Sequence, residues 1–387
     1  MPYHIEDVLE SVRNAPQPPA HTTTDDIINR ARRTRNRRNL AIGAGVVACL
    51  AAAVTVLPQL APADPSGIMA ANDGATPMAS FSPPPAAPID EPLPVKKIDF
   101  KTNLVEYRVG AYQIGPATTV TEGYTELPVY HDGLSWEDDL GSKYPLSVAT
   151  LTVYQKDLYD PSTFGGAGNA TLTIGEQYPV TVGGREAIGR DWTYGSPPDS
   201  SEPQKATSKQ TMAALAWQWD DEAWATFVPS YGGPDLPRAT VADIAEKLST
   251  DKERELKVPY RLGYVPKGWQ AVSVSQTEAK YGMSDSVVYL HQGPLANPAT
   301  RVDAVLPGHL SIGVFPKPKP GEKNEFSTEP GIQCYPDGES CSVIHGDYLV
   351  SLSGYGKLLS LDELRKVADG LELRDVADRS TWEKIDF

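Results

Sequence analysis

The chain has 387 residues, of which 40% are hydrophobic and 22% are charged, values that are ordinary for a globular protein of two or three domains. Its formal net charge is −15. That charge is unevenly placed, because residues 1–38 carry about +2 and leave the remainder with about −17. So acidic a remainder argues against nucleic acid or anionic lipid as its ligand.

The first 38 residues form a short tail with helical periodicity. Ile5, Val8, Leu9 and Val12 recur at the spacing of one helix face. Helices this small cannot build a hydrophobic core by themselves. We expect the tail, residues 1–38, either to dock on a cytoplasmic protein partner or only to set the topology of the chain.

An uncharged run of 22 residues, Leu40–Ala61, follows the tail. About 20 apolar residues suffice for a helix to cross a bilayer. No Lys or Arg follows the run until Lys96, and this asymmetry places the N-terminus in the cytoplasm. The sequence therefore predicts a transmembrane helix over 39–61 and a single-pass cell-membrane protein with an extracytoplasmic C-terminal body. The basic residues that flank the membrane are Arg30, Arg32, Arg33, Arg35, Arg37 and Arg38.

Cleavage of this segment after Ala63 is an alternative, because Ala61-Pro62-Ala63 resembles a signal-peptidase site. The charged region before the apolar run is about 38 residues, much longer than in ordinary signal peptides. We expect an uncleaved anchor and leave cleavage open. Residues 62–95 are rich in Pro and Ala and predict an extended linker without a core.

The part after the linker contains one pattern twice. A strand at Leu146–Tyr154 corresponds to a strand at Leu310–Phe315. A stretch of alternating large apolar residues at 214–228, with an acidic centre, corresponds to 341–353. Alternation of period two around a turn-rich centre is typical of a β-hairpin. A repeated unit is the most informative organisational feature of this chain.

Each copy ends in a predicted amphipathic helix, at Thr240–Leu248 and Ser360–Leu371, with a hydroxyl cap followed three residues later by an acid. We therefore expect an α+β fold of two tandem antiparallel-sheet units, 96–252 and 253–387, each with one packed helix. Residues 382–387 are expected to form a closing strand that pairs with the first copy.

Two short motifs carry a family resemblance. The segment Tyr264-Val-Pro-Lys-Gly-Trp269 and the helix at 359–371 resemble parts of extracytoplasmic domains in single-pass membrane proteins of actinobacterial type, many associated with anti-sigma regulators. The resemblance implies an extracytoplasmic location and a sensing role. The first copy lacks the Gly-Trp pair at Tyr112, and residues 1–38 lack the Cys and His pattern of a zinc anti-sigma module.

Cys334 and Cys341 are predicted to form a disulfide. The intervening Pro336-Asp337-Gly338 is a turn signal that folds the two cysteines toward each other. In an oxidising envelope such a pair is expected to be joined.

A group of aromatic residues gives the candidate ligand-binding site. In the first predicted hairpin Trp217 and Trp219 share a face and Trp224 opposes them across the turn. Indoles on an open face would make a platform for a sugar or a peptide, whereas on a closed face they would belong to the core. Trp192 and Tyr194 are the expected neighbours.

The sequence contains no Gly-x-Ser-x-Gly elbow, no His-Glu-x-x-His and no phosphate-binding loop. His131, Asp132 and the acidic residues 137–139 lack the spacing of a calcium loop and are read as a solvated loop. We expect no catalytic residue, metal or cofactor. The function favoured is a non-enzymatic binding or sensor protein, in its specific form an anti-sigma-like regulator with an envelope ligand or protein as partner. The alternatives are an accessory envelope protein and, least favoured, a cell-wall-active enzyme.

Overall fold

The computed structural model describes residues 97–137, 142–166, 172–195, 210–230, 233–278, 280–281, 285–302, 306–318, 330–335, 340–354 and 358–387. The predicted tail, membrane segment and linker lie outside these residues. Within the described part, no helix has the length and apolar character needed to span a membrane.

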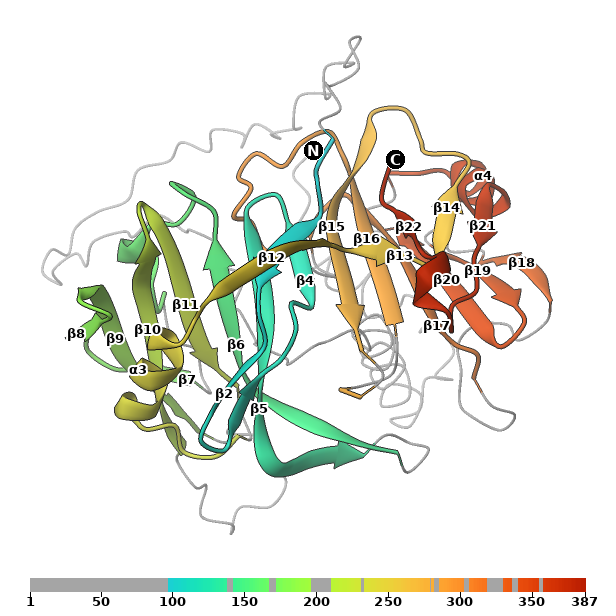
Figure 1. Cartoon of the computed structure of the whole chain (residues 1–387). Coiled ribbons are helices and arrows are strands. Elements are labelled where there is room, and N and C mark those ends of the chain that lie inside the picture. Colours follow the sequence, from blue (N-terminus) through green and yellow to red (C-terminus); the bar gives the residue numbers. More distant parts are fainter. Residues whose placement is uncertain are drawn as a thin grey trace, which may run out of the picture.

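The expected α+β fold, with an N-terminal transmembrane helix, is wrong as a description of this structure. The described residues are mostly β-strand and contain only two α-helices, each of nine residues (Figure 1). Both helices lie close to where helical periodicity predicted them. Helical periodicity located the helices. It led to the wrong fold class because each helix packs beside a far larger area of sheet.

In the N-terminal half of the described chain, residues 97–255, eleven strands precede the α-helix and one strand follows it. Its elements are β1 (Lys101–Leu104), β2 (Tyr107–Val109), β3 (Tyr112–Ile114), β4 (Thr119–Thr121), β5 (Tyr124–Glu137), β6 (Lys143–Tyr154), η1 (Pro161–Thr163), β7 (Leu172–Ile174), β8 (Tyr178–Val182), β9 (Arg185–Tyr194), β10 (Gln210–Asp220), β11 (Ala223–Pro229), α3 (Arg238–Glu246) and β12 (Thr250–Glu255).

The C-terminal half, residues 257–387, repeats this plan with fewer strands. Its elements are β13 (Lys257–Val258), β14 (Tyr260–Leu262), β15 (Trp269–Thr277), β16 (Asp285–Gln292), β17 (His309–Pro316), β18 (Gly331–Cys334), β19 (Ser340–His345), β20 (Tyr348–Gly354), α4 (Leu361–Asp369), β21 (Leu371–Leu373), η2 (Arg379–Thr381) and β22 (Glu383–Lys384).

A single sixteen-stranded sheet runs through both halves. Counted outward from the middle, the N-terminal half follows the order β4, β5, β6, β11, β10, β9, and the C-terminal half follows β15, β16, β17, β20, β19, β18. The two series meet where β4 pairs antiparallel with β15, so that Val120 lies opposite Val274. Equivalent strands that pair antiparallel imply an approximate two-fold axis between β4 and β15.

The predicted hairpins at 214–228 and 341–353 are confirmed as β10–β11 and β19–β20. The cap of the second helix is also confirmed, because the Ser360 hydroxyl accepts a 3.2 Å hydrogen bond from the Glu363 amide. The first helix instead begins at Arg238 after Pro237, so Thr240 is not its cap. The closing strand β22 pairs with β13 and not with the first copy. The domain boundaries stay predictions.

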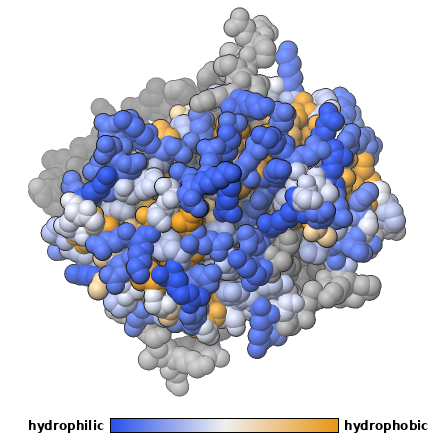
Figure 2. Space-filling model, viewed as in Figure 1, coloured by the Kyte–Doolittle hydropathy of each residue, from blue (hydrophilic) through white to orange (hydrophobic). Residues whose placement is uncertain are grey.

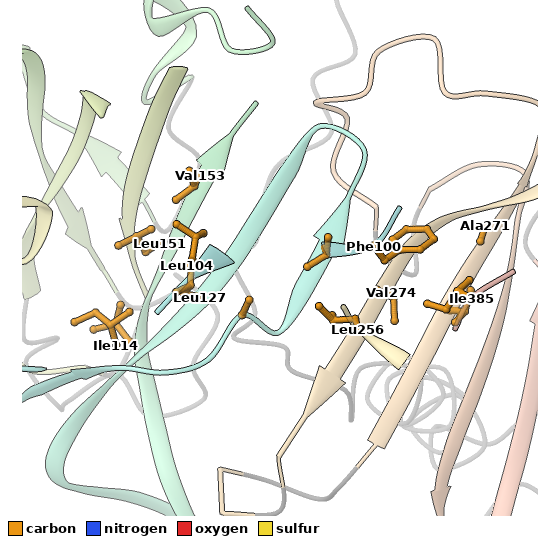
Figure 3. Packing of buried hydrophobic residues seen from close by; sticks show 14 of the residues in the cluster. Phe100, Leu104, Ile114, Leu127, Leu151, Val153, Leu256, Ala271, Val274 and Ile385 are labelled. Carbon is orange, nitrogen blue, oxygen red and sulfur yellow. The ribbon is translucent and has the colours of Figure 1, made fainter. Parts of the chain in front are cut away.

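A main hydrophobic core lies on the helix side of the sheet and draws residues from both halves (Figure 3). Leu127 and Leu151 come from the N-terminal half, and Val274 and Ile385 from the C-terminal half. All four are buried. One core shared by two copies explains why the sheet does not end between them.

The opposite side of the sheet is covered by connections rather than by helices. In the C-terminal half, Val302 and Leu306 from the connection between β16 and β17 bury Val287 and Tyr289. In the N-terminal half a smaller cluster forms around Phe164.

The two halves also touch through side chains next to the β4–β15 pair. The phenol oxygen of Tyr124 accepts a 2.8 Å hydrogen bond from the Val302 amide. Tyr130 stacks on Tyr281, with ring centroids 4.5 Å apart. At Gly123 a Cβ atom would lie 2.1 Å from the Pro298 carbonyl oxygen, so only glycine allows this approach.

Candidate binding surface

The five aromatic residues predicted to bind a ligand are divided between two hydrophobic clusters. Trp217 is 1% exposed and belongs to the main core, and Trp219 and Tyr194 pack against that core. Trp192 and Trp224 pack against a second cluster, around Phe164. The prediction that Trp217 and Trp219 share a face agrees with this arrangement, but the prediction that Trp224 opposes them is wrong, because Trp224 lies opposite Gln218. The sheet does not bring the five side chains together into one open platform.

Burial of an indole ring can leave its N–H group without a hydrogen-bond partner. Within the described residues, the indole nitrogens of Trp192 and Trp219 are buried without a hydrogen-bond partner. Trp224 instead contacts Tyr159, with ring centroids 6.4 Å apart. The aromatic group is thus distributed through two packed layers, where its main contribution is buried apolar area.

The predicted disulfide is confirmed. Cys334 at the end of β18 is bonded to Cys341 at the start of β19, and the two residues lie directly opposite in the ladder. The bond therefore fastens the outermost strand of the C-terminal half to its neighbour.

The feature that sequence reasoning missed is a projecting two-stranded arm, which consists of residues 131–137 of β5 and 143–147 of β6. β3 pairs with β5 only as far as His131, and β11 pairs with β6 only from Ala149. Beyond these points, among the described residues, the two strands of the arm pair only with each other. Figure 1 shows the arm extending away from the rest of the sheet.

One face of the arm is apolar. Trp136 lies directly across from Tyr144, and their ring centroids are 5.0 Å apart. Because side chains alternate along a strand, Leu134 and Leu146 belong to the same face. Trp136 is 37% exposed, whereas Leu134 at the base packs against the main core.

The other face is mainly polar: Glu137 lies opposite Lys143, and Ser135 lies opposite Pro145. The arm is therefore an amphipathic ribbon. Trp136 and Leu358 are the two exposed large hydrophobic residues in the described part of the chain. The face of the molecule in Figure 2 is mainly hydrophilic, with small scattered hydrophobic areas.

A large irregularity at the base sets the direction of the arm. The register moves from Tyr130 opposite Ser147 to Ser135 opposite Pro145, so β5 holds more residues here than β6. Extra residues on one strand bend it and increase its twist. Gly133 allows this path with a φ of +77°.

The base is also tied to its neighbours by polar groups. The Arg108 guanidinium forms an ion pair with Asp132 and donates a 3.1 Å hydrogen bond to the Gln113 side chain. His131 packs edge-on against Tyr112, at 4.8 Å between ring centroids. In the part of the chain that the structure describes, no three His, Cys, Asp or Glu side chains are grouped to hold a metal ion.

A signal for the arm is present in the sequence. Leu134 and Trp136 alternate with polar residues before the acidic stretch, and Tyr144 and Leu146 alternate after it. This is the pattern of a hairpin with one apolar face. The acids at 137–139 instead led to the expectation of a solvated loop, which is wrong for residues 131–137 because they belong to β5.

No protein-family model matches this chain, and no curated protein matches it. Among solved structures, the chain is similar to the crystal structure of MucB in complex with MucA(peri), with a TM-score of 0.19 and 11% sequence identity over 68% of this chain and 93% of that chain. At this TM-score the similarity carries no argument about fold or function.

Proposed function

We propose that the described body is a non-enzymatic binding module that works outside the cytoplasm and uses the arm to recognise a partner protein. The observation that carries the proposal is the apolar face around Trp136 and Tyr144. The specific form suggested by the sequence resemblance is an anti-sigma-like regulator, whose tail at residues 1–38 reports binding to a cytoplasmic protein.

An isolated two-stranded hairpin is at best marginally stable in water, because it buries little apolar surface. The arm nevertheless keeps a tryptophan and a tyrosine at its outer part, where Trp136 is 37% exposed. Such residues dominate the energetics of protein interfaces, and the truncation of one frequently costs about 2 kcal/mol or more of binding free energy. A partner that covers this face removes it from water and stabilises the arm.

The chemistry around the face indicates the kind of partner. Glu137 is exposed at the outer part of the arm, and the chain beyond residue 38 carries about −17. A partner with an apolar groove rimmed by Lys or Arg complements this combination. Its association rate is expected to fall as salt concentration rises.

Two further observations support an extracytoplasmic site of action. The disulfide between Cys334 and Cys341 is typical of proteins in oxidising compartments. The acidic body fits a protein that stays soluble beside acidic envelope surfaces. Thiol alkylation in intact cells tests the location, because cytoplasmic protein would be trapped with both thiols free.

The function is tested by crosslinking in cells that express tagged full-length protein. Wild type, Trp136→Ala, Tyr144→Ala and the control Leu358→Ala are compared; Leu358 is 54% exposed and outside the arm. We expect one discrete partner to be recovered with wild type and Leu358→Ala and lost with the two arm variants. Equal recovery with Trp136→Ala would contradict the proposal. A variant that lacks residues 1–38 then shows whether a cytoplasmic protein is recovered only with the tail.

A further inference from the structure

The outer edge of β18 is a second surface, separate from the arm. β18 is the last strand in its direction of the sixteen-stranded sheet, and it pairs with β19. Among the described residues no strand pairs with its other side. An open edge of this kind presents main-chain donors and acceptors to any extended chain that approaches it.

The register identifies which main-chain groups face outward. The Tyr335 amide donates a 3.0 Å hydrogen bond to the Ser340 carbonyl, so these two residues form a hydrogen-bonded pair. Pairs alternate along an antiparallel ladder, which makes Cys334 with Cys341 a non-hydrogen-bonded pair. Their Cα atoms are 4.0 Å apart, in keeping with the closer spacing of such pairs. The amides and carbonyls of Ile332 and Cys334 therefore point away from β19.

Two other exposed strands among the described residues, β12 and β8, carry protection that β18 lacks. β12 is a run of exposed charged residues, 251–254, and β8 contains Pro179, which has no amide hydrogen to offer. β18 reads Gly331-Ile332-Gln333-Cys334, with neither a charge nor a proline.

The edge is also held in place on two sides. The disulfide prevents the strand from separating from β19. Ile332 and Cys334 pack against the main core, together with Leu361 of α4. A binding edge that is already ordered loses little conformational entropy when a partner arrives.

We propose that β18 binds an extended segment of another protein that contains no acidic residue, as an additional strand of the sheet. The outward groups, two amides and two carbonyls in alternation, match an extended backbone. The molecule already joins its own halves in this manner, where β4 and β15 pair through three residues each. The negative charge of the chain disfavours an acidic segment. The proposal stands independently of the arm, because it uses a different strand in the other half.

The test uses the full chain and a synthetic ten-residue peptide of alternating Val and Thr with one Lys at each end. Amide hydrogen exchange is followed residue by residue. In the free protein we expect the amides of Ile332 and Cys334 to exchange fast and that of Gln333 to exchange slowly. Addition of the peptide should slow the first two and leave Gln333 unchanged. Protection of Ile332 in the free protein, or no protection by the peptide, would overturn the proposal.

A matched pair of charge variants completes the test. Gln333→Lys places a charge on the edge strand, and Thr181→Lys places the same charge on the exposed strand β8. Peptide affinity measured by fluorescence anisotropy should fall about tenfold or more, equivalent to about 1.4 kcal/mol, with Gln333→Lys and stay constant with Thr181→Lys. Equal affinity for both variants would show that the peptide binds elsewhere. Circular dichroism confirms that both variants are folded.

Discussion

The two halves of the molecule share one order of strands, but an equivalent connection projects from the sheet in one half and packs against it in the other. In the N-terminal half the hairpin between β5 and β6 projects as the arm. In the C-terminal half the connection between β16 and β17 folds back and buries Val302 and Leu306 against the sheet. The same supersecondary plan thus yields an exposed apolar face in one copy and a covered one in the other.

At the outer ends of the sheet the relation is reversed: the N-terminal half is covered and the C-terminal half is open. In the N-terminal half, β9 is covered along its outer side by the short strands β7 and β8. In the C-terminal half the equivalent strand, β18, is outermost and fastened by a disulfide. The comparison teaches that the shared core sets the strand order, while the connections decide which surfaces remain available to partners.

The largest expected effect is a difference in stability between a variant at a buried tryptophan and a variant at an exposed one. Trp217→Ala empties a fully buried site and should lower the free energy of unfolding by about 3–5 kcal/mol. Trp136→Ala, on the arm, should change it by no more than about 0.5 kcal/mol. Urea unfolding followed by fluorescence measures both. A similar cost at the two positions would mean that the arm is part of the stable core and not a free surface.

The second effect concerns the fastening of β18. Replacement of both Cys334 and Cys341 by Ser should lower the free energy of unfolding by about 2–3 kcal/mol, because the bond restricts the unfolded chain. Reduced wild-type protein should behave like the double variant in the same urea titration. A cost under about 0.5 kcal/mol would indicate that the ladder to β19 alone holds the strand.

A third measurement compares the covered connection with the projecting one. Val302→Ala removes two buried methyl groups and should cost about 1.6 kcal/mol, whereas Leu146→Ala on the half-buried arm should cost less. Thermal unfolding of both variants gives the comparison. The contrast between the halves would be broken if Leu146→Ala were the more destabilising change.

The smallest effect is the contribution of Tyr130 to stability. Tyr130 lies where the two halves meet, and its contribution depends on pH. Burial raises the pKa of the Tyr130 phenol well above its usual range, with smaller contributions from Tyr281 and the carboxylates of Glu278 and Glu106. Above pH 10 the unfolded chain loses this proton while the folded chain keeps it, so stability falls by about 1.4 kcal/mol per pH unit. Below pH 10 the contribution is fully present.

Tyr130→Phe should remove that slope, and urea unfolding between pH 9 and pH 11 measures it. The other buried tyrosines contribute equally to both proteins, so the difference isolates one phenol. An unchanged slope would show that Tyr130 titrates normally and that the contact with Tyr281 is open to water.

Much of the local structure could be predicted from the sequence. Alternation around a turn identified both hairpins, a hydroxyl followed by an acid identified the cap at Ser360, and the short spacing of Cys334 and Cys341 identified the disulfide. These features depend on neighbours in the sequence. The pairing of Val120 with Val274 and the partner of the closing strand depend on contacts across more than a hundred residues, which no local pattern encodes.

The candidate site shows the same division. The aromatic composition of β9 to β11 was plain in the sequence, but which side of a sheet is covered depends on distant connections. Trp217 and Trp219 share a face as alternation requires, and that face proved to be the closed one. Trp136 was not predicted as a site residue because its single indole lies beside an acidic stretch. Its alternation with Leu134 is nevertheless visible in the sequence.

The approximate two-fold axis between β4 and β15 has a consequence for valency. Two identical subunits related by such an axis must present each surface twice, and a change in one subunit is copied in the other. Two copies within one chain are free of that constraint. Each can lose a surface that the other keeps, so a duplicated chain can become an adaptor with two unlike sites, which joins two different proteins instead of collecting two of the same.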